Sequence, residues 1–392
     1  MKWGFLLLFE IVFLPQNTAG LHAQPVDIYG YLESQYTGMY LYKVYYQFQS
    51  SKLRIDLKST SVAHTEFGAD FINLLYCGKR NWNILEFLPD KIVASLPTEM
   101  YPLFQFAYED SFYPDNIYAR IGFNRFALTI GKQQISMGTG YFFNPTDVFN
   151  VKNMLDPTYE QPGHNAIRMD ISLKSRFQVM ALVSPINADW EHSGKFMRIK
   201  CGIGHFDFSV IGGKLDYSIT DFYNFQTRRG SKKVLGGDVV GELIGLGVWA
   251  EGAYNYLDYD EDFYEFTSGT DYTLNSGFYT LIEYHRNSLA KADYTGYDLN
   301  DWMGFLTGET RSISRDEIAC YFRYPATDLL TISTSIVTSI SDGSAVFVPT
   351  IEYSLFENIN LSLMVNLYTG KEGKAFGRAL GNGGLLRATL YF

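Results

Sequence analysis

The sequence predicts an all-β protein, a transmembrane antiparallel β-barrel of about eighteen strands, with sixteen as the fallback. Three observations predict it: an apolar N-terminal leader, recurrent alternation of apolar and polar residues, and many aromatic side chains. The 392 residues include 30 Tyr and 30 Phe, and aromatics make up 17% of the chain. Charged residues make up 19%, below the ~25% of ordinary soluble domains. The mean hydropathy of −0.09 is too low for a helical membrane protein.

The N-terminus has the pattern of a secretory leader. Lys2 precedes an apolar stretch over 3–14, interrupted by Glu10, and small residues follow up to Ala23. This order of basic, apolar and small residues predicts a signal peptide over 1–23 and a single barrel domain over 24–392. The alternative is a buried N-terminal helix of a soluble protein. No later stretch approaches the ~18 apolar residues of a spanning helix.

Period-two alternation recurs along the rest of the chain. Successive side chains of a strand face opposite sides of the sheet, so one face is apolar and the other polar. Residues 52–58 illustrate this, with apolar Leu53, Ile55 and Leu57 between charged neighbours. Seventeen segments follow the pattern: 27–39, 52–58, 66–76, 116–123, 126–135, 167–173, 177–184, 196–203, 206–213, 234–243, 245–256, 273–286, 317–324, 329–340, 345–354, 359–367 and 386–392.

The connections favour a membrane barrel over a soluble sandwich, which would alternate as well. Short connections at 122–125, 174–176 and 204–205 take turns with long ones at 136–164, 214–233 and 257–272. Membrane barrels have short turns at one end and longer loops at the other. Bacterial single-chain barrels have an even number of strands. We therefore expect an eighteenth strand between Arg286 and Glu317, where the rhythm breaks.

The C-terminal strand ends on an aromatic residue. Leu386, Ala388, Leu390 and Phe392 share one face. This segment resembles the closing strand of bacterial outer-membrane barrels, whose last residue is commonly Phe. The resemblance implies recognition of Phe392 by the barrel-assembly machinery, and an outer-membrane location in contact with its lipid and lipopolysaccharide.

A motif in the first third of the chain extends the resemblance. Residues 131–140 read GKQQISMGTG, and residues 143–150 read FNPTDVFN. Together they resemble porin-like outer-membrane β-barrel proteins, in which a strand ends in Gly-Arg/Lys-Gln-x-x-x-Trp-Gly and an Asn-Pro-x-Asp loop follows. Met137 stands where Trp is more usual, so the anchoring of the loop can differ. The resemblance implies an architecture and leaves the substrate open.

If the apolar positions face lipid, the interleaved charged positions face a lumen. A barrel of this strand number encloses an aqueous channel, in which rings of charge set the ion preference. The inward set has ten basic and eight acidic residues, which predicts a mixed, weakly anion-leaning wall. The alternative is that opposite charges only pair across neighbouring strands. The pore-lining candidates are Lys52, Arg54, Asp56, Lys58, Arg120, Arg168, Asp170, Lys174, Arg198, Lys200, Glu251 and Arg323, with further inward positions at Asp70, Asp238, Glu242, Glu283, Glu352 and Arg387.

The longest early loop, 137–163, is a second candidate site. It is rich in Gly, Phe, Asn, Pro and Asp, and it follows a strand early in the barrel. It can fold into the lumen as a constriction, with Asp147, Lys152, Asp156 and Glu160 exposed to solute. The alternative is a surface loop packed by its own aromatic residues.

The sequence gives no support to several other functions. A net charge of −10 argues against a nucleic-acid surface. The six histidines are scattered and form no metal-binding motif, and the acidic run 258–262 lacks the EF-hand spacing. No G-x-S-x-G pattern is present, and we expect no enzyme and no cofactor. We expect a channel for passive diffusion of small hydrophilic solutes. The alternatives are a non-conducting barrel for adhesion or surface-polymer export, and a barrel hydrolase.

Overall fold

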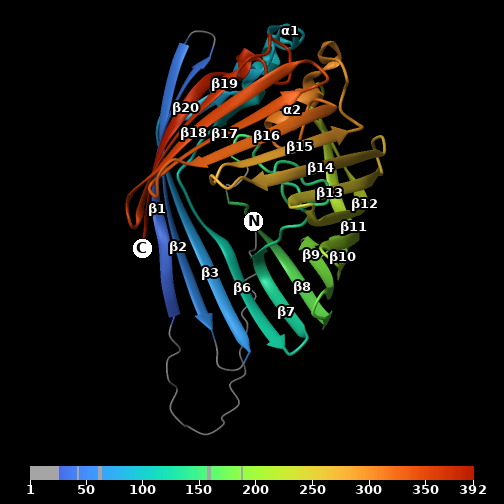
Figure 1. Ribbon diagram of the computed structural model, residues 1–392. Helices are drawn as coiled ribbons and strands as arrows, with labels where there is room; N and C mark the ends of the chain where they lie inside the picture. The colour runs from blue at the N-terminus through green and yellow to red at the C-terminus, as the bar shows by residue number, and fades with distance from the viewer. Residues whose placement is uncertain (1–25, 42–43, 61–63, 157–159, 187–188) are drawn as a thin grey trace, which may run out of the picture.

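The computed structural model describes residues 26–41, 44–60, 64–156, 160–186 and 189–392, so the expected signal peptide lies outside the described residues. Eighteen antiparallel strands form one sheet that closes on itself (Figure 1). The strands are β1 (Val26–Leu41), β2 (Val44–Thr60), β3 (Thr65–Gly78), β6 (Ser111–Phe123), β7 (Phe126–Gln134), β8 (Gly163–Lys174), β9 (Phe177–Ile186), β10 (Asp189–Ile203), β11 (Phe206–Asp221), β12 (Gln226–Leu243), β13 (Leu246–Leu257), β14 (Phe263–Thr273), β15 (Tyr279–Asn287), β16 (Asp316–Pro325), β17 (Leu330–Ser339), β18 (Ser344–Phe356), β19 (Ile359–Tyr368) and β20 (Asn382–Tyr391).

The barrel closes where the last strand pairs with the first. β1 pairs with both β2 and β20, and the β1–β20 register runs from Tyr31 opposite Tyr391 to Tyr40 opposite Asn382. Beyond β20, the N–H of Phe392 donates to the carbonyl of Gly30, and the N–H of Gly30 donates back, both at 3.1 Å. Closure leaves no unpaired sheet edge, as a spanning sheet requires in lipid. The predicted antiparallel barrel of eighteen strands is confirmed.

The position expected for the eighteenth strand is wrong. Residues between β15 and β16 form the 3₁₀ turn η3 (Tyr294–Gly296) and the helix α2 (Leu299–Leu306). The strand without a clear sequence signal is β14, which occupies most of the expected long connection 257–272 and ends at Thr273. Its outward face carries Ser268 and Thr270 between Tyr264, Phe266 and Tyr272, so polar residues interrupt the apolar phase. The expected long connection 214–233 is also wrong, because β11 and β12 extend through it to a turn at 222–225.

Four long connections lie at one end of the barrel, the end where α1 and α2 lie in Figure 1. They cover 79–110, 135–162, 288–315 and 369–381, whereas all the connections at the opposite end are short. Their remaining elements are β4 (Asn81–Asn83), η1 (Ile84–Phe87), α1 (Asp90–Val93), η2 (Thr98–Phe104), β5 (Gln105–Ala107) and η4 (Arg378–Leu380).

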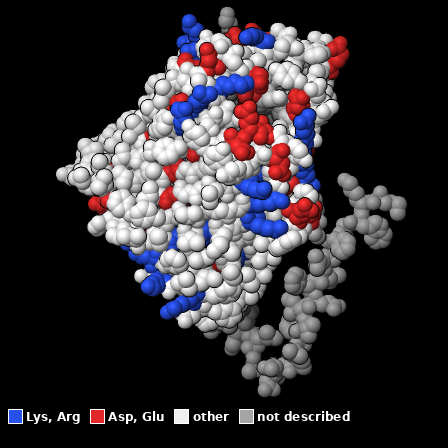
Figure 2. Space-filling model, turned by 90° about the vertical axis from the view of Figure 1, so that its right-hand side faces the viewer, with Lys and Arg blue, Asp and Glu red and all other residues white. Residues whose placement is uncertain are grey.

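The outer face of the barrel is apolar. Ile130, Ile167, Ile282 and Leu363 are each about 45% exposed there. Broad areas of the face shown in Figure 2 carry no charged side chain, and the charged residues gather in clusters. Such a surface suits the hydrocarbon of a membrane. Among the described residues, no helix is long and apolar enough to cross a membrane.

The interior is packed where the long connections enter it. Leu88, Phe142, Trp302 and Phe376, one from each of the four connections, are each no more than 2% exposed and belong to one apolar cluster with residues of the wall. The barrel is therefore partly filled by its own loops, and any passage through it is narrower than the ring of strands.

Candidate functional site

The described residues between β7 and β8, 135–156 and 160–162, lie inside the barrel (Figure 1), and we call them the inner segment. Its first part is held by Glu251 of β13. The carboxylate of Glu251 accepts the backbone N–H groups of Thr139 at 2.6 Å, Gly140 at 3.1 Å and Thr146 at 2.7 Å. These donors offset part of the cost of burying a carboxylate that is only 1% exposed.

Glu283 of β15 holds the next three residues in the same way. Its carboxylate accepts the N–H groups of Tyr141 at 2.6 Å and of Phe142 and Phe143 at 2.8 Å. The indole N–H of Trp249 donates a fourth bond at 2.8 Å. Together, two wall glutamates pin the inner segment to the barrel wall through hydrogen bonds that involve an ionised acceptor, the stronger class of hydrogen bond.

Internal hydrogen bonds shape the inner segment. The carboxylate of Asp147 accepts the N–H groups of Phe149 and Asn150, both at 3.1 Å, and that of Met137 at 3.3 Å. The side chain of Asn150 donates to the carbonyl of Ile135 at 2.6 Å. Asp147 is 2% exposed, so it shapes the turn and does not face solute, in contrast to the sequence-based expectation.

Lys152 and Gly138 fix the first half of the segment further. The ammonium of Lys152 donates to the carbonyls of Gly140 at 2.8 Å and Tyr141 at 3.0 Å, and burial lowers the pKa of Lys152. Gly138 has φ = +82°, and a Cβ there would lie 2.5 Å from Glu251 Oε1. The motif therefore needs glycine at 138 both for the backbone conformation and for the close approach to the wall.

The end of the inner segment meets the opposite side of the barrel through Glu160. Its carboxylate contacts Lys52 at 2.9 Å, Arg54 at 3.2 Å and the Tyr31 hydroxyl, which donates at 2.7 Å. Burial raises the pKa of Glu160, but these partners outweigh it and the net pKa is lowered.

Arg54 is the centre of a wider network. Its guanidinium contacts the carboxylates of Asp56 at 2.7 Å, Asp70 at 2.9 Å and Asp115 at 3.3 Å, besides that of Glu160. The Arg54 side chain is 13% exposed. One cation therefore holds several strand carboxylates together, and its removal would leave them facing one another.

Arg387 of β20 makes the second contact between the wall and the end of the inner segment. Its guanidinium contacts Asp156 at 3.1 Å, lies 3.6 Å from Glu33 and donates to the Gln35 side-chain oxygen at 3.1 Å. Asp156 was expected to be exposed to solute. It lines the lumen cavity described below, but its side chain is only 15% exposed and is paired with Arg387.

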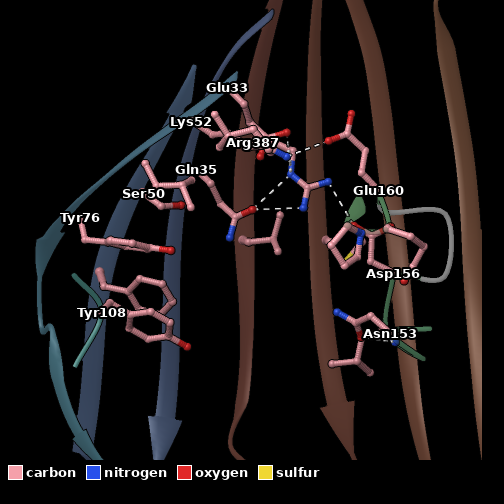
Figure 3. A pocket seen from close by; sticks show the side chains of 18 of the residues that line it. Glu33, Gln35, Ser50, Lys52, Tyr76, Tyr108, Asn153, Asp156, Glu160 and Arg387 are labelled. Carbon is pink, nitrogen blue, oxygen red and sulfur yellow. Dashed lines mark hydrogen bonds and ion pairs between the residues drawn. The ribbon is translucent and has the colours of Figure 1, made fainter. Parts of the chain in front are cut away.

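A cavity of about 510 Å³ lies between this end of the inner segment, the 79–110 connection and the wall formed by β1, β2, β3, β6, β19 and β20. Figure 3 shows the rings of Tyr76 and Tyr108 together on one side, with Arg387, Asp156 and Glu160 on the other. The remaining lining includes Asn153 from the inner segment and Asn366 from β19. The cavity therefore offers polar groups of both signs and an aromatic surface.

The other predicted pore-lining residues lie elsewhere on the wall. Four cations pair with nearby carboxylates: Lys58 with Glu66 at 3.3 Å, Arg168 with Asp170 at 2.9 Å, Arg198 with Asp238 at 3.1 Å and Lys200 with Asp207 at 3.2 Å. Arg120, Lys174 and Arg323 are exposed, and none of the three lines the cavity. Of these candidates, Lys52 and Arg54 of β2 contact Glu160 of the inner segment, and Asp56 pairs with Arg54. Glu251 serves as the anchor of the segment.

Sequence reasoning missed three functional contributions. Glu283 was expected only as an inward side chain, and its role as an anchor depends on where the inner segment crosses the lumen. Glu33 lies on the first predicted strand but was not singled out. Arg311, in the 288–315 connection, contacts Glu265 of β14 at 2.8 Å and donates to the carbonyl of Asp147. No local pattern marks such long-range partners.

Metal chemistry has no support in the part of the chain that the structure describes, where no three His, Cys, Asp or Glu side chains lie together as a metal site. The acidic run 258–262 forms a tight connection instead. Its Asp258 accepts the N–H of Ser231 at 2.7 Å, and Asp262 accepts that of Leu257 at 3.0 Å.

Comparison of the sequence with known families and with curated proteins found no match. Comparison of the fold with solved structures found similar ones. Acinetobacter baumannii OccAB3 is 10% identical with a TM-score of 0.56, over 94% of this chain and 99% of that chain. Pseudomonas aeruginosa OccK11 (OpdR) is 10% identical with a TM-score of 0.56, over 94% and 96%. Pseudomonas aeruginosa OpdL is 12% identical with a TM-score of 0.54, over 94% and 98%.

These similar structures are outer-membrane barrels. At 10–12% identity the similarity shows the fold alone, over almost the whole length of both chains. The chain therefore has the fold of an outer-membrane β-barrel.

Proposed function

We propose that this protein is a channel of the bacterial outer membrane that lets small hydrophilic solutes diffuse through its lumen. The observation that carries the proposal is the inner segment, which is pinned to both sides of the wall and leaves a polar cavity beside it. The inner segment narrows the passage. It is held there by hydrogen bonds to buried carboxylates, and a polar cavity stays open beside it. The structurally similar proteins are outer-membrane porin channels, which supports the same function.

The cavity gives the proposed channel a local charge preference. Among the described residues, its lining includes the carboxylates of Glu33, Asp115, Asp156 and Glu160 and two cations, Lys52 and Arg387. Rings of carboxylates favour cations in aqueous pores. We therefore propose a slight cation preference at this point, in contrast to the weak anion preference expected from the wall as a whole.

Export and assembly belong to the same proposal. Residues 1–23 would direct the chain across the inner membrane, and Phe392 would be the residue that the barrel-assembly machinery recognises. The apolar outer face would contact outer-membrane lipid and lipopolysaccharide. The position of Phe392 at the β1–β20 seam supports this role, because recognition there would act where the barrel closes.

Planar-bilayer recording of refolded protein tests the channel. We expect discrete single-channel steps, a reversal potential that indicates weak cation preference, and swelling of liposomes in small sugars and amino acids but not in larger ones. Heat-denatured protein is the control. A folded barrel that neither conducts nor permits swelling would refute the proposal and favour adhesion or polymer export, and lipid or peptide hydrolysis would favour the enzyme alternative.

A further inference from the structure

Three aromatic rings form one side of the cavity, and we call Phe48, Tyr76 and Tyr108 the aromatic shelf. The rings of Phe48 and Tyr108 are nearly parallel, 14° apart, with centroids 5.7 Å from each other. The ring of Tyr76 lies 5.1 Å from that of Tyr108. Tyr113 also lines the cavity. The rings belong to β2, β3 and the 79–110 connection, so three separate segments converge on one aromatic surface.

A second layer of residues holds the aromatic shelf in place. Trp82, which is 4% exposed, packs edge-on against Phe48 with centroids 6.1 Å apart. The ammonium of Lys79 lies 4.2 Å from the Trp82 ring, and the Trp82 indole donates to the Lys79 carbonyl at 3.0 Å. The backbone N–H of Tyr108 donates to the Arg80 carbonyl at 3.0 Å. These contacts keep the rings in position without a ligand, which reduces the entropy that binding would cost.

The other side of the cavity is polar, and its charges already have partners. Arg387 contacts Asp156 and Gln35, and Lys52 contacts Glu160. Acids outnumber bases in the lining, so an anionic ligand would face a repulsive balance. Hydroxyl groups suit this side better, since each can donate to a carboxylate and accept from a guanidinium or an amide.

We propose that this cavity binds a neutral sugar ring, whose C–H face stacks on the aromatic shelf while its hydroxyls bond to the polar side. The proposal rests on the proposed channel function and names its solute class. A cavity of about 510 Å³ lies in the usual range of small-molecule sites, ~300–1,000 Å³. The rings of Phe48 and Tyr108 are stacked, so a sugar ring can lie flat on the end of the stack at Tyr108, which is 36% exposed. A cation, by contrast, is held best by rings that surround a point.

Current block by sugars tests the proposal in a conducting channel. Glucose and maltose added to wild-type channels in a planar bilayer should interrupt the ion current in a concentration-dependent way. Tyr108→Ala and Phe48→Ala should each weaken the block about tenfold or more, and Tyr108→Phe should keep it, because the ring is retained. Phe123→Ala, on the outer face of the barrel and 59% exposed, is the matched control and should change nothing.

Calorimetry in detergent separates this proposal from the channel function. Sugar binding by a protein that does not conduct would support the site and refute the channel. A conducting channel that neither binds nor is blocked by either sugar would overturn the site and leave the channel intact. If choline or succinate bound more tightly than glucose, and if that binding were lost in Tyr108→Ala, the proposal that the ligand is a neutral sugar would be overturned. The heat-dependent gel mobility of each variant verifies that its barrel has folded.

Discussion

Replacing Glu283 by glutamine should release the inner segment from the wall. The two carboxylate oxygens divide four donors between them. Oε1 accepts from Phe142 and Phe143, and Oε2 accepts from Tyr141 and the Trp249 indole. Glutamine has one carbonyl oxygen and one NH₂ group. In either orientation of the amide, two N–H donors lose their acceptor and face another donor.

The size of the effect follows from those two lost bonds. A hydrogen bond to a charged group contributes about 1.5–3 kcal/mol, so Glu283→Gln should cost about 3–6 kcal/mol of anchoring free energy. Every 1.4 kcal/mol is a factor of ten, so the detached population should rise at least about a hundredfold. Residues 141–143 would then leave β15, while the Glu251 anchor keeps the preceding residues in place.

Single-channel recording measures this change directly. We expect Glu283→Gln channels to conduct more than wild type, with rapid fluctuations as the segment detaches and returns. Glu352→Gln, at an exposed position on β18, is the matched control and should conduct like wild type. The reasoning is refuted if folded Glu283→Gln protein shows wild-type conductance, wild-type noise and an unchanged unfolding temperature.

Four further predictions concern other parts of the structure. Arg54→Met should shift the reversal potential toward stronger cation preference and cost about 3–5 kcal/mol of stability, because four carboxylates lose their shared cation. An unchanged reversal potential would contradict this prediction. The lowered pKa of Glu160 means that its ion pairs persist below the usual glutamate pKa of about 4.3. Current noise should therefore stay constant from pH 7 to about 4.3 and rise only in more acidic solution. A rise in noise already between pH 7 and 5 would argue against this role of Glu160. Gly138→Ala should lower the unfolding temperature more than Gly204→Ala. Both glycines have positive φ, but only a Cβ added at position 138 would lie against a wall carboxylate. Equal shifts in unfolding temperature would show that backbone strain alone matters. Deletion of Phe392 should reduce the fraction of heat-modifiable barrel assembled in cells more than the fraction refolded in detergent, and equal yields in cells would count against recognition of this residue.

The fold followed from the sequence wherever the two faces of a strand differ in polarity. Residues 52–58 and 167–173 alternate strictly, because one face meets lipid and the other meets water. β14 was missed because polar Ser268 and Thr270 stand on its outward face, where the residues opposite them on β13 and β15 are apolar or aromatic: Val248, Ala250, Ile282 and Tyr284. The expectation of an even number of strands corrected the total from seventeen to eighteen, but the missing strand was assigned to the wrong connection.

The site followed from the sequence only in part. Alternation identified Lys52, Arg54 and Glu251 as side chains on the polar face of their strands, because the face on which a residue lies can be read within a single strand. It could not pair Glu283 with Phe142 or Arg387 with Asp156, because those contacts depend on how far the inner segment reaches across the closed ring. The aromatic shelf was hidden for the same reason, as its rings come from three segments and share no local spacing.

The seam between β1 and β20 has a consequence for the order of folding. Tyr31 pairs with Tyr391, whereas Leu41 of the same strand pairs with Val44. Each doubling of a loop costs about 0.6 kcal/mol of chain entropy, so closing the seam costs only about 4 kcal/mol more than closing the hairpin. The difficulty is kinetic: until the last strand arrives, β1 and β20 both present open edges that can pair with other chains. The half-made sheet is the aggregation-prone species, and its lifetime is set by the time that the final strand needs to reach the first.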